Sequence, residues 1–248
     1  MYRPRVIPCL LLHDNGLFKT KKFKDPVYVG DPINAVRIFS DKEADEIMVL
    51  DIDATKNGRE PNYDLISEIA GEAFMPMAYG GGVTCVNQVR RLIRCGIEKV
   101  VINSAALSSP NLIYESAQIF GKQAIVGSID IRKTLFGSYR VVTNCGARDA
   151  EVDLNLHISN LVSAGVGEIL INNIDRDGMM EGYDLELIKN ISEGLRVPLI
   201  VCGGAGGKDH LIEGIHAGAS AVAAGSMFVF HGKHKAVLIS YSNDLVNA

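Results

Sequence analysis

The chain has 248 residues, of which 47% are hydrophobic and 22% charged, and its formal net charge is −4. This composition allows a large buried core, and the charge balance offers no basic footprint for nucleic acid, which excludes that class of partner. The apolar stretches are short and interrupted by Gly, Asp or Asn, so we expect no membrane span and no membrane partner.

Strand-like runs alternate with helical patterns along the chain. Runs rich in β-branched residues and bounded by turn residues predict eight strands, near residues 5–11, 46–52, 76–79, 98–102, 123–130, 168–173, 198–202 and 220–224. Between them, apolar residues at three-to-four spacing predict helices, among them Val86 to Arg94, Leu112 to Phe120, Leu154 to Ala164 and Leu185 to Glu193. The sequence therefore predicts eight strand–helix units.

Half of the chain recurs in the other half at an offset of 122 residues. The pairs with this offset are Asp51 and Asn173, Asp53 and Asp175, Pro76 and Pro198, Gly81–Gly82 and Gly203–Gly204, Gly96 and Gly218, and Asn103–Ser104 and Gly225–Ser226. No linker separates the halves, which indicates one domain over residues 1–248 with half-barrels of about 1–120 and 121–248. Because an open sheet has two different edges, the repeat favours an α/β fold, a single (β/α)8 TIM barrel built from two similar half-barrels.

Glycine-rich turns follow the third and seventh strands, and Ser-bearing turns follow the fourth and eighth. They are Gly80–Gly82 and Gly203–Gly207, and Asn103–Ser104 and Gly225–Ser226. In a parallel barrel these turns lie on one face, where backbone N–H groups and helix N-termini can bind anions. One glycine-rich turn alone could equally serve only to make a tight strand–helix connection. Two matched copies predict phosphate sites on opposite sides of the open end of the barrel. A long substrate with a phosphate at each end is implied.

One position breaks the repeat. The first strand, Val6 to Leu11, aligns with Ile125 to Asp130 at an offset of 119, so Leu11 stands where the second half has Asp130. A carboxylate at a strand end in the mouth is a natural proton-transfer group, whereas leucine can neither donate nor accept a proton. The alternative role for Asp130 is a capping or salt-bridge carboxylate in the turn.

Seven motifs occur in order along the whole chain. They are Val-Ile-Pro-Cys-Leu, Val-Leu-Asp-Ile, Tyr-Gly-Gly-Gly-Val, Ile-Asn-Ser-Ala-Ala, Asp-Arg-Asp-Gly, Cys-Gly-Gly-Ala-Gly and Ala-Ala-Gly-Ser-Met-Phe. In combination they resemble the cyclase subunit of imidazole glycerol phosphate synthase. The resemblance implies a barrel that takes ammonia from a glutaminase subunit and cleaves a bis-phosphorylated ribulosyl formimino ribonucleotide. Imidazole glycerol phosphate and an aminoimidazole carboxamide ribotide result, and no cofactor is implied.

The resemblance also assigns the residues of the active site. One phosphate site falls on Gly82, Asn103 and Ser104, and the other on Asp177, Gly178, Gly204, Gly225 and Ser226. The catalytic candidates are Asp130, Asp177 and Lys19, the last of which matches the lysine of a substrate-covering loop. Leu11 replaces the first catalytic aspartate. General acid–base assistance is typically worth about 10²–10⁴ in rate, which puts the ordinary cyclase reaction in doubt.

Two other carboxylates lie near the missing one in sequence. Asp14 belongs to the turn signal Asp-Asn-Gly, three residues beyond Leu11, so we expect a loop residue outside the barrel. Asp53 is the repeat mate of Asp175, and it is either a carboxylate of the mouth or a turn carboxylate.

Charged residues also mark the starts of four strands. Arg5, Glu46, Lys99 and Glu168 stand where the family has a ring that closes the bottom of the barrel and admits ammonia. Charges at strand starts also commonly serve only to solvate that face, but all four together favour a gate. Glu98 matches an acidic residue that contacts the glutaminase subunit, so we expect that partner at the N-terminal face of the barrel.

The cysteines and histidines indicate no metal site. The five cysteines form no Cys-x-x-Cys pair, and the one close histidine pair, His231 and His234, lacks an acidic or thiolate partner, so we expect a solvated loop there. The first residues, Met-Tyr-Arg-Pro-Arg, lack the apolar core of a signal peptide, and the expected compartment is the cytoplasm.

Three functions are compatible with these features. The first is the histidine-pathway cyclase with Leu11 tolerated or compensated. The second is a cyclase-like paralogue that passes ammonia to a separate sugar-amidating enzyme of surface-polysaccharide synthesis. The segment Cys9 to Thr20 resembles the first strand and loop of these paralogues, because it contains Leu-Leu-Leu followed by Gly-Leu-Phe-Lys-Thr. The third is a non-catalytic scaffold that binds phosphorylated ligands. The loss of one carboxylate beside intact phosphate turns and gate favours the second.

Overall fold

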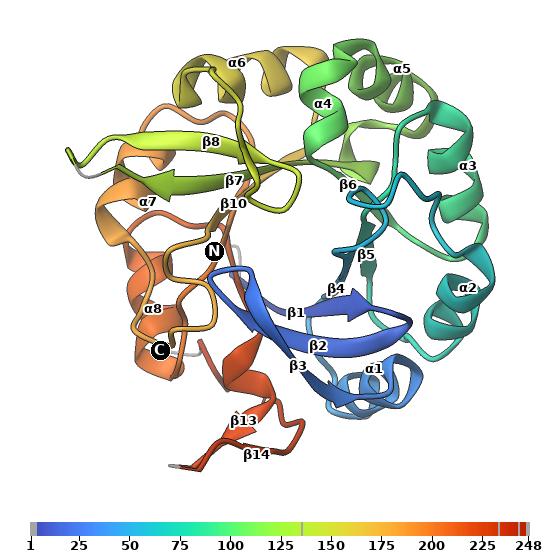
Figure 1. Ribbon diagram of the computed structural model, residues 1–248, viewed down its shortest axis with the longest axis vertical. Helices are drawn as coiled ribbons and strands as arrows, with labels where there is room; N and C mark the ends of the chain where they lie inside the picture. The colour runs from blue at the N-terminus through green and yellow to red at the C-terminus, as the bar shows by residue number, and fades with distance from the viewer. Residues whose placement is uncertain (1–3, 135, 233, 243, 247–248) are drawn as a thin grey trace.

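Eight parallel strands close into a barrel in the computed structural model, which describes residues 4–134, 136–232, 234–242 and 244–246 (Figure 1). The strands are β1 (Arg5–His13), β4 (Ile47–Asp51), β5 (Met77–Gly80), β6 (Lys99–Ile102), β7 (Ile125–Lys133), β10 (Glu168–Asn173), β11 (Leu199–Cys202) and β12 (Ala221–Ala224). Each pairs in parallel with the next, and β12 pairs with β1. The predicted (β/α)8 TIM barrel is confirmed.

Helices surround the barrel on its outside (Figure 1). They are α1 (Pro32–Asp41), α2 (Tyr63–Gly71), α3 (Val86–Arg94), α4 (Ser104–Ser108), α5 (Pro110–Phe120), α6 (Leu154–Ala164), α7 (Leu185–Ser192) and α8 (Lys208–His216), with a 3-10 turn η1 (Lys122–Ala124) before β7. Asp or Asn side chains cap four of them at the N-terminus, as Asp184 does for α7. No helix within the described ranges is long and apolar enough to cross a membrane.

The eighth unit departs from the expected helix after every strand. In the described part of the chain, β12 is followed by the 3-10 helix η2 (Ser226–Phe228) and the short strands β13 (Phe230–His231) and β14 (Ala236–Val237), and by no α-helix. Phe228 and Tyr241 instead pack against Phe39 of α1, with ring centroids 6.2 and 6.3 Å from that of Phe39. Buried aromatic side chains therefore complete the core at this point.

The strand registers reproduce the sequence repeat. Leu11 of β1 pairs with Leu50 of β4, and Asp130 of β7 pairs with Asn172 of β10, which are the same positions shifted by 119 and 122 residues. Leu11 and Asp130 thus occupy equivalent places in the barrel wall. The division into half-barrels at about residue 120 stays a prediction.

Two hydrophobic clusters fill the molecule, one inside the barrel and one between the barrel and its helices. The inner cluster consists of Ile7, Cys9, Met48, Ala78, Val101, Val126, Leu170, Ile200, Ala221 and Ala223, with Leu11, Leu50 and Cys202 packed on it. Alternate side chains of each strand point inward, so these residues follow from the two-residue period of a strand. The barrel has a packed interior between its two ends.

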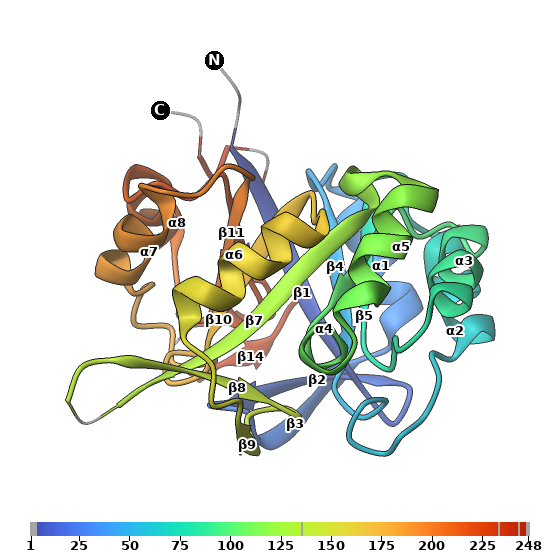
Figure 2. The same ribbon diagram turned by 90° about the horizontal axis from the view of Figure 1, so that it is seen from above.

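Two antiparallel extensions lie at the same end of the barrel (Figure 2). After β1 the chain forms β2 (Gly16–Lys21) and β3 (Lys24–Gly30), and after β7 it forms β8 (Tyr139–Thr143) and β9 (Arg148–Asp149). The first hairpin turns at Asp14 and Asn15, which both have positive φ, as the turn signal predicts. These extensions lie at the carboxyl ends of the strands.

Phe39 offers a direct test of how the eighth unit is stabilised. Its side chain is 0% exposed, so Phe39→Ala should lower the free energy of unfolding by about 3–5 kcal/mol through the cavity it leaves. Urea denaturation followed by circular dichroism measures this loss. Phe74→Ala is the matched control, because Phe74 is 91% exposed and its loss should change stability by no more than about 0.5 kcal/mol. Equal losses in the two variants would contradict the packing described.

Candidate active site

A cavity of about 270 Å³ opens at the carboxyl ends of the barrel strands. All the residues predicted from the sequence for catalysis and phosphate binding line it, and so does Leu11. They are Lys19, Gly82, Asn103, Ser104, Asp130, Asp177, Gly178, Gly204, Gly225 and Ser226. The fold therefore brings these side chains and turns to one place, while their chemical roles stay predictions.

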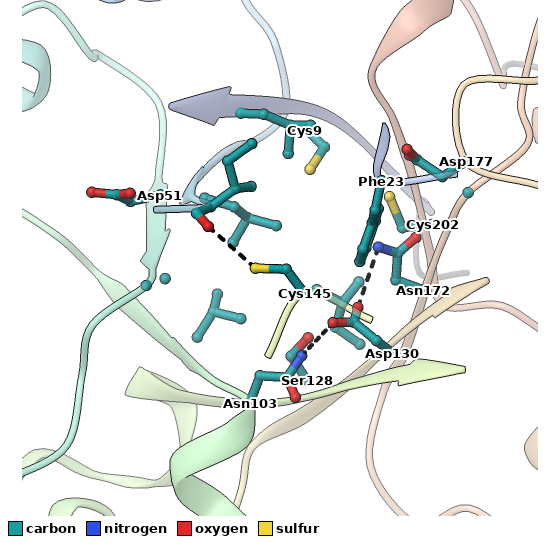
Figure 3. Close-up of a pocket in the computed structure, with 18 of the residues that line it drawn as sticks. Cys9, Phe23, Asp51, Asn103, Ser128, Asp130, Cys145, Asn172, Asp177 and Cys202 are labelled. Carbon is teal, nitrogen blue, oxygen red and sulfur yellow. Dashed lines mark hydrogen bonds between the residues drawn. The ribbon is translucent and has the colours of Figure 1, made fainter. Parts of the chain in front are cut away.

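Asp130 is held by two amide side chains (Figure 3). Its Oδ2 accepts a hydrogen bond of 2.9 Å from Asn103 Nδ2, and its Oδ1 accepts one of 3.3 Å from Asn172 Nδ2. Burial raises the pKa of Asp130 to about 7, although both amides favour the ionised form. A carboxyl group with this pKa can take up and release a proton near neutral pH, as general acid–base catalysis requires.

Asp177 anchors the first hairpin over the cavity. Its carboxylate accepts a hydrogen bond of 2.9 Å from Thr20 Oγ1, and its carbonyl oxygen accepts one of 2.9 Å from the backbone N–H of Lys22. Burial raises the pKa of Asp177. Gly178 has a φ of +69°, and a Cβ there would collide with the carbonyl oxygen of Thr20, so this close approach requires glycine.

Lys19 is folded into the cavity from the same hairpin. Its Nζ donates a hydrogen bond of 2.5 Å to the carbonyl oxygen of Cys9 and lies against Gly225, where a Cβ would collide with it. Burial lowers the pKa of Lys19. The lysine that matches that of the substrate-covering loop thus contacts a glycine of the second predicted phosphate site.

The opposite end of the barrel carries a closed ring of four charges. The Arg5 guanidinium donates to Glu46 Oε2 at 2.5 Å and to Glu168 Oε1 at 2.7 Å. Lys99 Nζ completes the ring, at 2.7 Å from Glu46 Oε2 and 3.2 Å from Glu168 Oε2. Glu98, beside Lys99 in sequence, is exposed at this end. The four residues predicted as a gate are in contact with one another.

Comparison with known proteins identifies the family. The model of the histidine biosynthesis protein family matches residues 5–235. The chain belongs to this family. A Pseudomonas aeruginosa protein provisionally named imidazole glycerol phosphate synthase subunit hisF2 is 54% identical over 242 residues, which are 97% of this chain and 96% of the relative. The imidazole glycerol phosphate synthase subunit HisF of Streptomyces avermitilis is 40% identical over 226 residues, 91% of this chain and 90% of the relative.

The glycine turns of this family member have a structural role in the barrel. Gly81 and Gly203, at φ of +118° and +91°, each pack on the backbone of the preceding strand end, where a Cβ would meet the carbonyl oxygen of Asp51 or Asn173. These two contacts are related by the repeat. Tight packing of the turns therefore requires glycine there without any ligand, and phosphate binding stays a prediction.

Two groups of the first predicted phosphate site already have protein partners. The backbone N–H of Gly82 donates to Thr55 Oγ1 at 3.1 Å, and Ser104 Oγ accepts from the backbone N–H of Asn144 at 3.2 Å. Asn144 lies in the turn between β8 and β9 and has a positive φ. The second extension thus contacts the predicted phosphate turn. The hydrogen bond between Asn144 and Ser104 must break if Ser104 Oγ is to bind a phosphate.

Asp51, at the end of β4, lines the cavity, but its Oδ1 accepts hydrogen bonds of 2.9 Å from the backbone N–H groups of Asp53 and Ala54, which hold it in the turn after the strand. Asp14 and Asp53 are the two other carboxylates close to Leu11 in sequence. The side chain of Asp14 is 83% exposed. Asp53 accepts hydrogen bonds from the Asp14 backbone N–H at 2.9 Å and lies 2.8 Å from His13 Nδ1, and it is not among the residues that line the cavity. Asp14 is therefore a loop residue and Asp53 a turn carboxylate.

Several residues of the cavity were not predicted from the sequence. Phe23, Ser128, Cys145, Asn172 and Cys202 all line it (Figure 3). Asn172 could have been found, because it is the repeat mate of Leu50 and stands one strand from Asp130. Phe23 and Cys145 lie in the two extensions, where no sequence pattern indicates which side chain turns inward.

The charged ring predicts unequal effects of two arginine substitutions. Arg5→Met leaves Glu46 and Glu168 sharing one cation, and it should lower the free energy of unfolding by about 2–4 kcal/mol, since partial exposure of Arg5 reduces the cost expected for a fully buried pair. Urea denaturation measures the loss. Arg37→Met is the matched control, because its ion pair with Glu72 is exposed and should contribute little. A similar midpoint for both variants would refute a stabilising ring.

Proposed function

We propose that this protein is the barrel subunit of a glutamine amidotransferase of the imidazole glycerol phosphate synthase type. The observation that carries the proposal is Asp130, a buried carboxyl group with a pKa of about 7 in a cavity lined by every predicted phosphate residue. Such a group can exchange a proton with a bound phosphorylated compound. Lys19 and Asp177 are the other groups of this cavity that we assign to catalysis.

Ammonia enters, in this proposal, through the ring at the N-terminal end. Arg5, Glu46, Lys99 and Glu168 close that end, and the inner hydrophobic cluster lies between the ring and the cavity. An apolar interior suits neutral ammonia and disfavours the ammonium ion, because burial of an unpaired charge is costly. A glutaminase subunit would bind the face that carries the ring and the exposed Glu98.

We assign the ammonia to a sugar acceptor in surface-glycan synthesis, through a separate sugar-amidating enzyme. Leu11 removes a carboxylate from the half of the mouth where cyclisation needs one, while Asp130 and the ring remain. The chain is also more similar to the Pseudomonas aeruginosa hisF2, at 54% identity, than to the Streptomyces avermitilis HisF, at 40%. Both observations support a paralogue that delivers ammonia.

The histidine-pathway cyclase is the second candidate. It is favoured by both sets of predicted phosphate residues, which a conduit for ammonia alone would not need. In that case the replacement at Leu11 is tolerated or compensated, and Asp130 takes part in the proton transfers.

Turnover of the cyclase substrate distinguishes the two candidates. With the bis-phosphorylated ribulosyl formimino ribonucleotide and an ammonium salt, we expect the parent protein to form imidazole glycerol phosphate at least about 100-fold more slowly than Leu11→Asp, because the variant restores a general acid–base group. Product formation is followed by chromatography. Leu11→Asn, which has the shape of aspartate without its acidity, should stay as slow as the parent. A parent as fast as Leu11→Asp would establish the cyclase and refute the paralogue.

A further inference from the structure

Asn172 and Asp130 form a polar pair on neighbouring strands. They are directly opposite in the register of β7 and β10, and both are buried, with exposed fractions of 7% and 8%. Asn172 Nδ2 donates to Asp130 Oδ1 at 3.3 Å, while Asn103 holds the other carboxylate oxygen from the end of β6. Both oxygens of Asp130 therefore have an amide donor, and Figure 3 shows the three side chains converging.

The orientation of the Asn172 amide carries a cost. Its Oδ1 is buried and has no hydrogen-bond partner within the described ranges. An unsatisfied buried acceptor is unfavourable, so the amide keeps this orientation only if its N–H groups gain more than its oxygen loses. The hydrogen bond to the Asp130 carboxylate provides that gain, because bonds to a charged acceptor are stronger than neutral ones.

The first half of the barrel lacks both members of the pair. Leu11 and Leu50 hold the equivalent places on β1 and β4 and pair with each other in the same register. Where the carboxylate is absent, the amide is absent too. The amide of Asn172 thus accompanies the carboxylate of Asp130 in the half-barrel that has one.

No cation substitutes for the amides. No lysine or arginine in the ranges that the structure describes forms an ion pair with Asp130. Among the other ionisable groups, the charge of Asp177 disfavours ionisation of Asp130, and the charge of Asp130 disfavours ionisation of the Cys9 and Cys145 thiols. The two amides are thus the groups that favour the carboxylate against burial.

We propose that Asn172 is a positioning residue for the general acid–base group of this site. It donates to Asp130 Oδ1, which keeps the carboxylate oriented into the cavity and ionised in the neutral range. In each catalytic cycle, one proton would move to an Asp130 oxygen and leave again, and no covalent bond to Asn172 forms or breaks. The role in catalysis rests on the proposed function, whereas the effect on ionisation does not.

Titration of Asp130 in two nearly isosteric variants tests this role. The carboxyl carbon of Asp130 is followed by NMR against pH, with its signal assigned by its loss in Asp130→Asn. Asn172→Val removes the donor and should raise the midpoint from about 7 by about one pH unit, because the ionised form loses a charge-assisted hydrogen bond. Asn172→Thr has the shape of the valine variant but supplies a hydroxyl donor in place of the amide, and it should titrate close to the parent.

The outcomes separate this inference from the function on which it builds. Equal midpoints in Asn172→Val and the parent would overturn the role of Asn172, whatever the protein catalyses. If Asn172→Val does not fold, Asn172→Leu replaces it, since leucine already fills the equivalent place at residue 50. The titration needs no substrate and no partner. A shifted midpoint in a protein that neither uses ammonia nor binds a phosphorylated compound would therefore refute the proposed function alone.

Discussion

Closure of eight parallel strands into one barrel is the constraint on which the site depends. Parallel strands place all their carboxyl ends on one face, and the two-residue period of a strand turns alternate side chains inward. Along the barrel this produces a ring of charges at the N-terminal end, a packed apolar interior, and the cavity at the other end. Residues as distant in sequence as Lys19, Asn103 and Ser226 meet there only because the barrel closes.

Within this frame the mouth has two unlike sides. On β7 and β10 the residues that line the cavity are Ser128, Asp130, Leu170 and Asn172, whereas on β1 and β4 they are Cys9, Leu11, Leu50 and, at the strand end, Asp51. Among these residues Asp130 is the titratable side chain on the first side, whereas Lys19 reaches the second side from the hairpin after β1. The apolar second side continues the inner hydrophobic cluster up to the cavity, which suits the passage of a small neutral molecule. The replacement at Leu11 is thus accompanied by other apolar residues on the same strands, such as Leu50.

Much of the fold could be predicted from the sequence, because β-branched runs and helical spacing are local signals. The helix over Val86–Arg94 has the expected bounds, and β1 extends only two residues beyond its predicted end. The hairpin strands β2 and β3 were not predicted, since Lys24, Pro26 and other residues of low strand propensity obscure them and their pairing with β1 is a tertiary effect. The repeat led to Asp130 and to the glycine and serine turns at strand ends, but it did not lead to Asn172 or Cys202, which also lie at strand ends in the cavity. The direction of an amide such as that of Asn172 depends on side-chain packing, which no local pattern encodes.

The central claim is that ammonia reaches its acceptor through the barrel. In the most direct measurement, the complex of this protein and its glutaminase subunit is supplied with glutamine that carries ¹⁵N in its side-chain amide. The buffer contains excess unlabelled ammonium. Mass spectrometry of the aminated product then reports the source of its nitrogen. The account predicts a product that carries mainly the glutamine label, with the label lost when Arg5→Met disrupts the ring. A product whose nitrogen matches the bulk ammonium in the unmodified complex would contradict it.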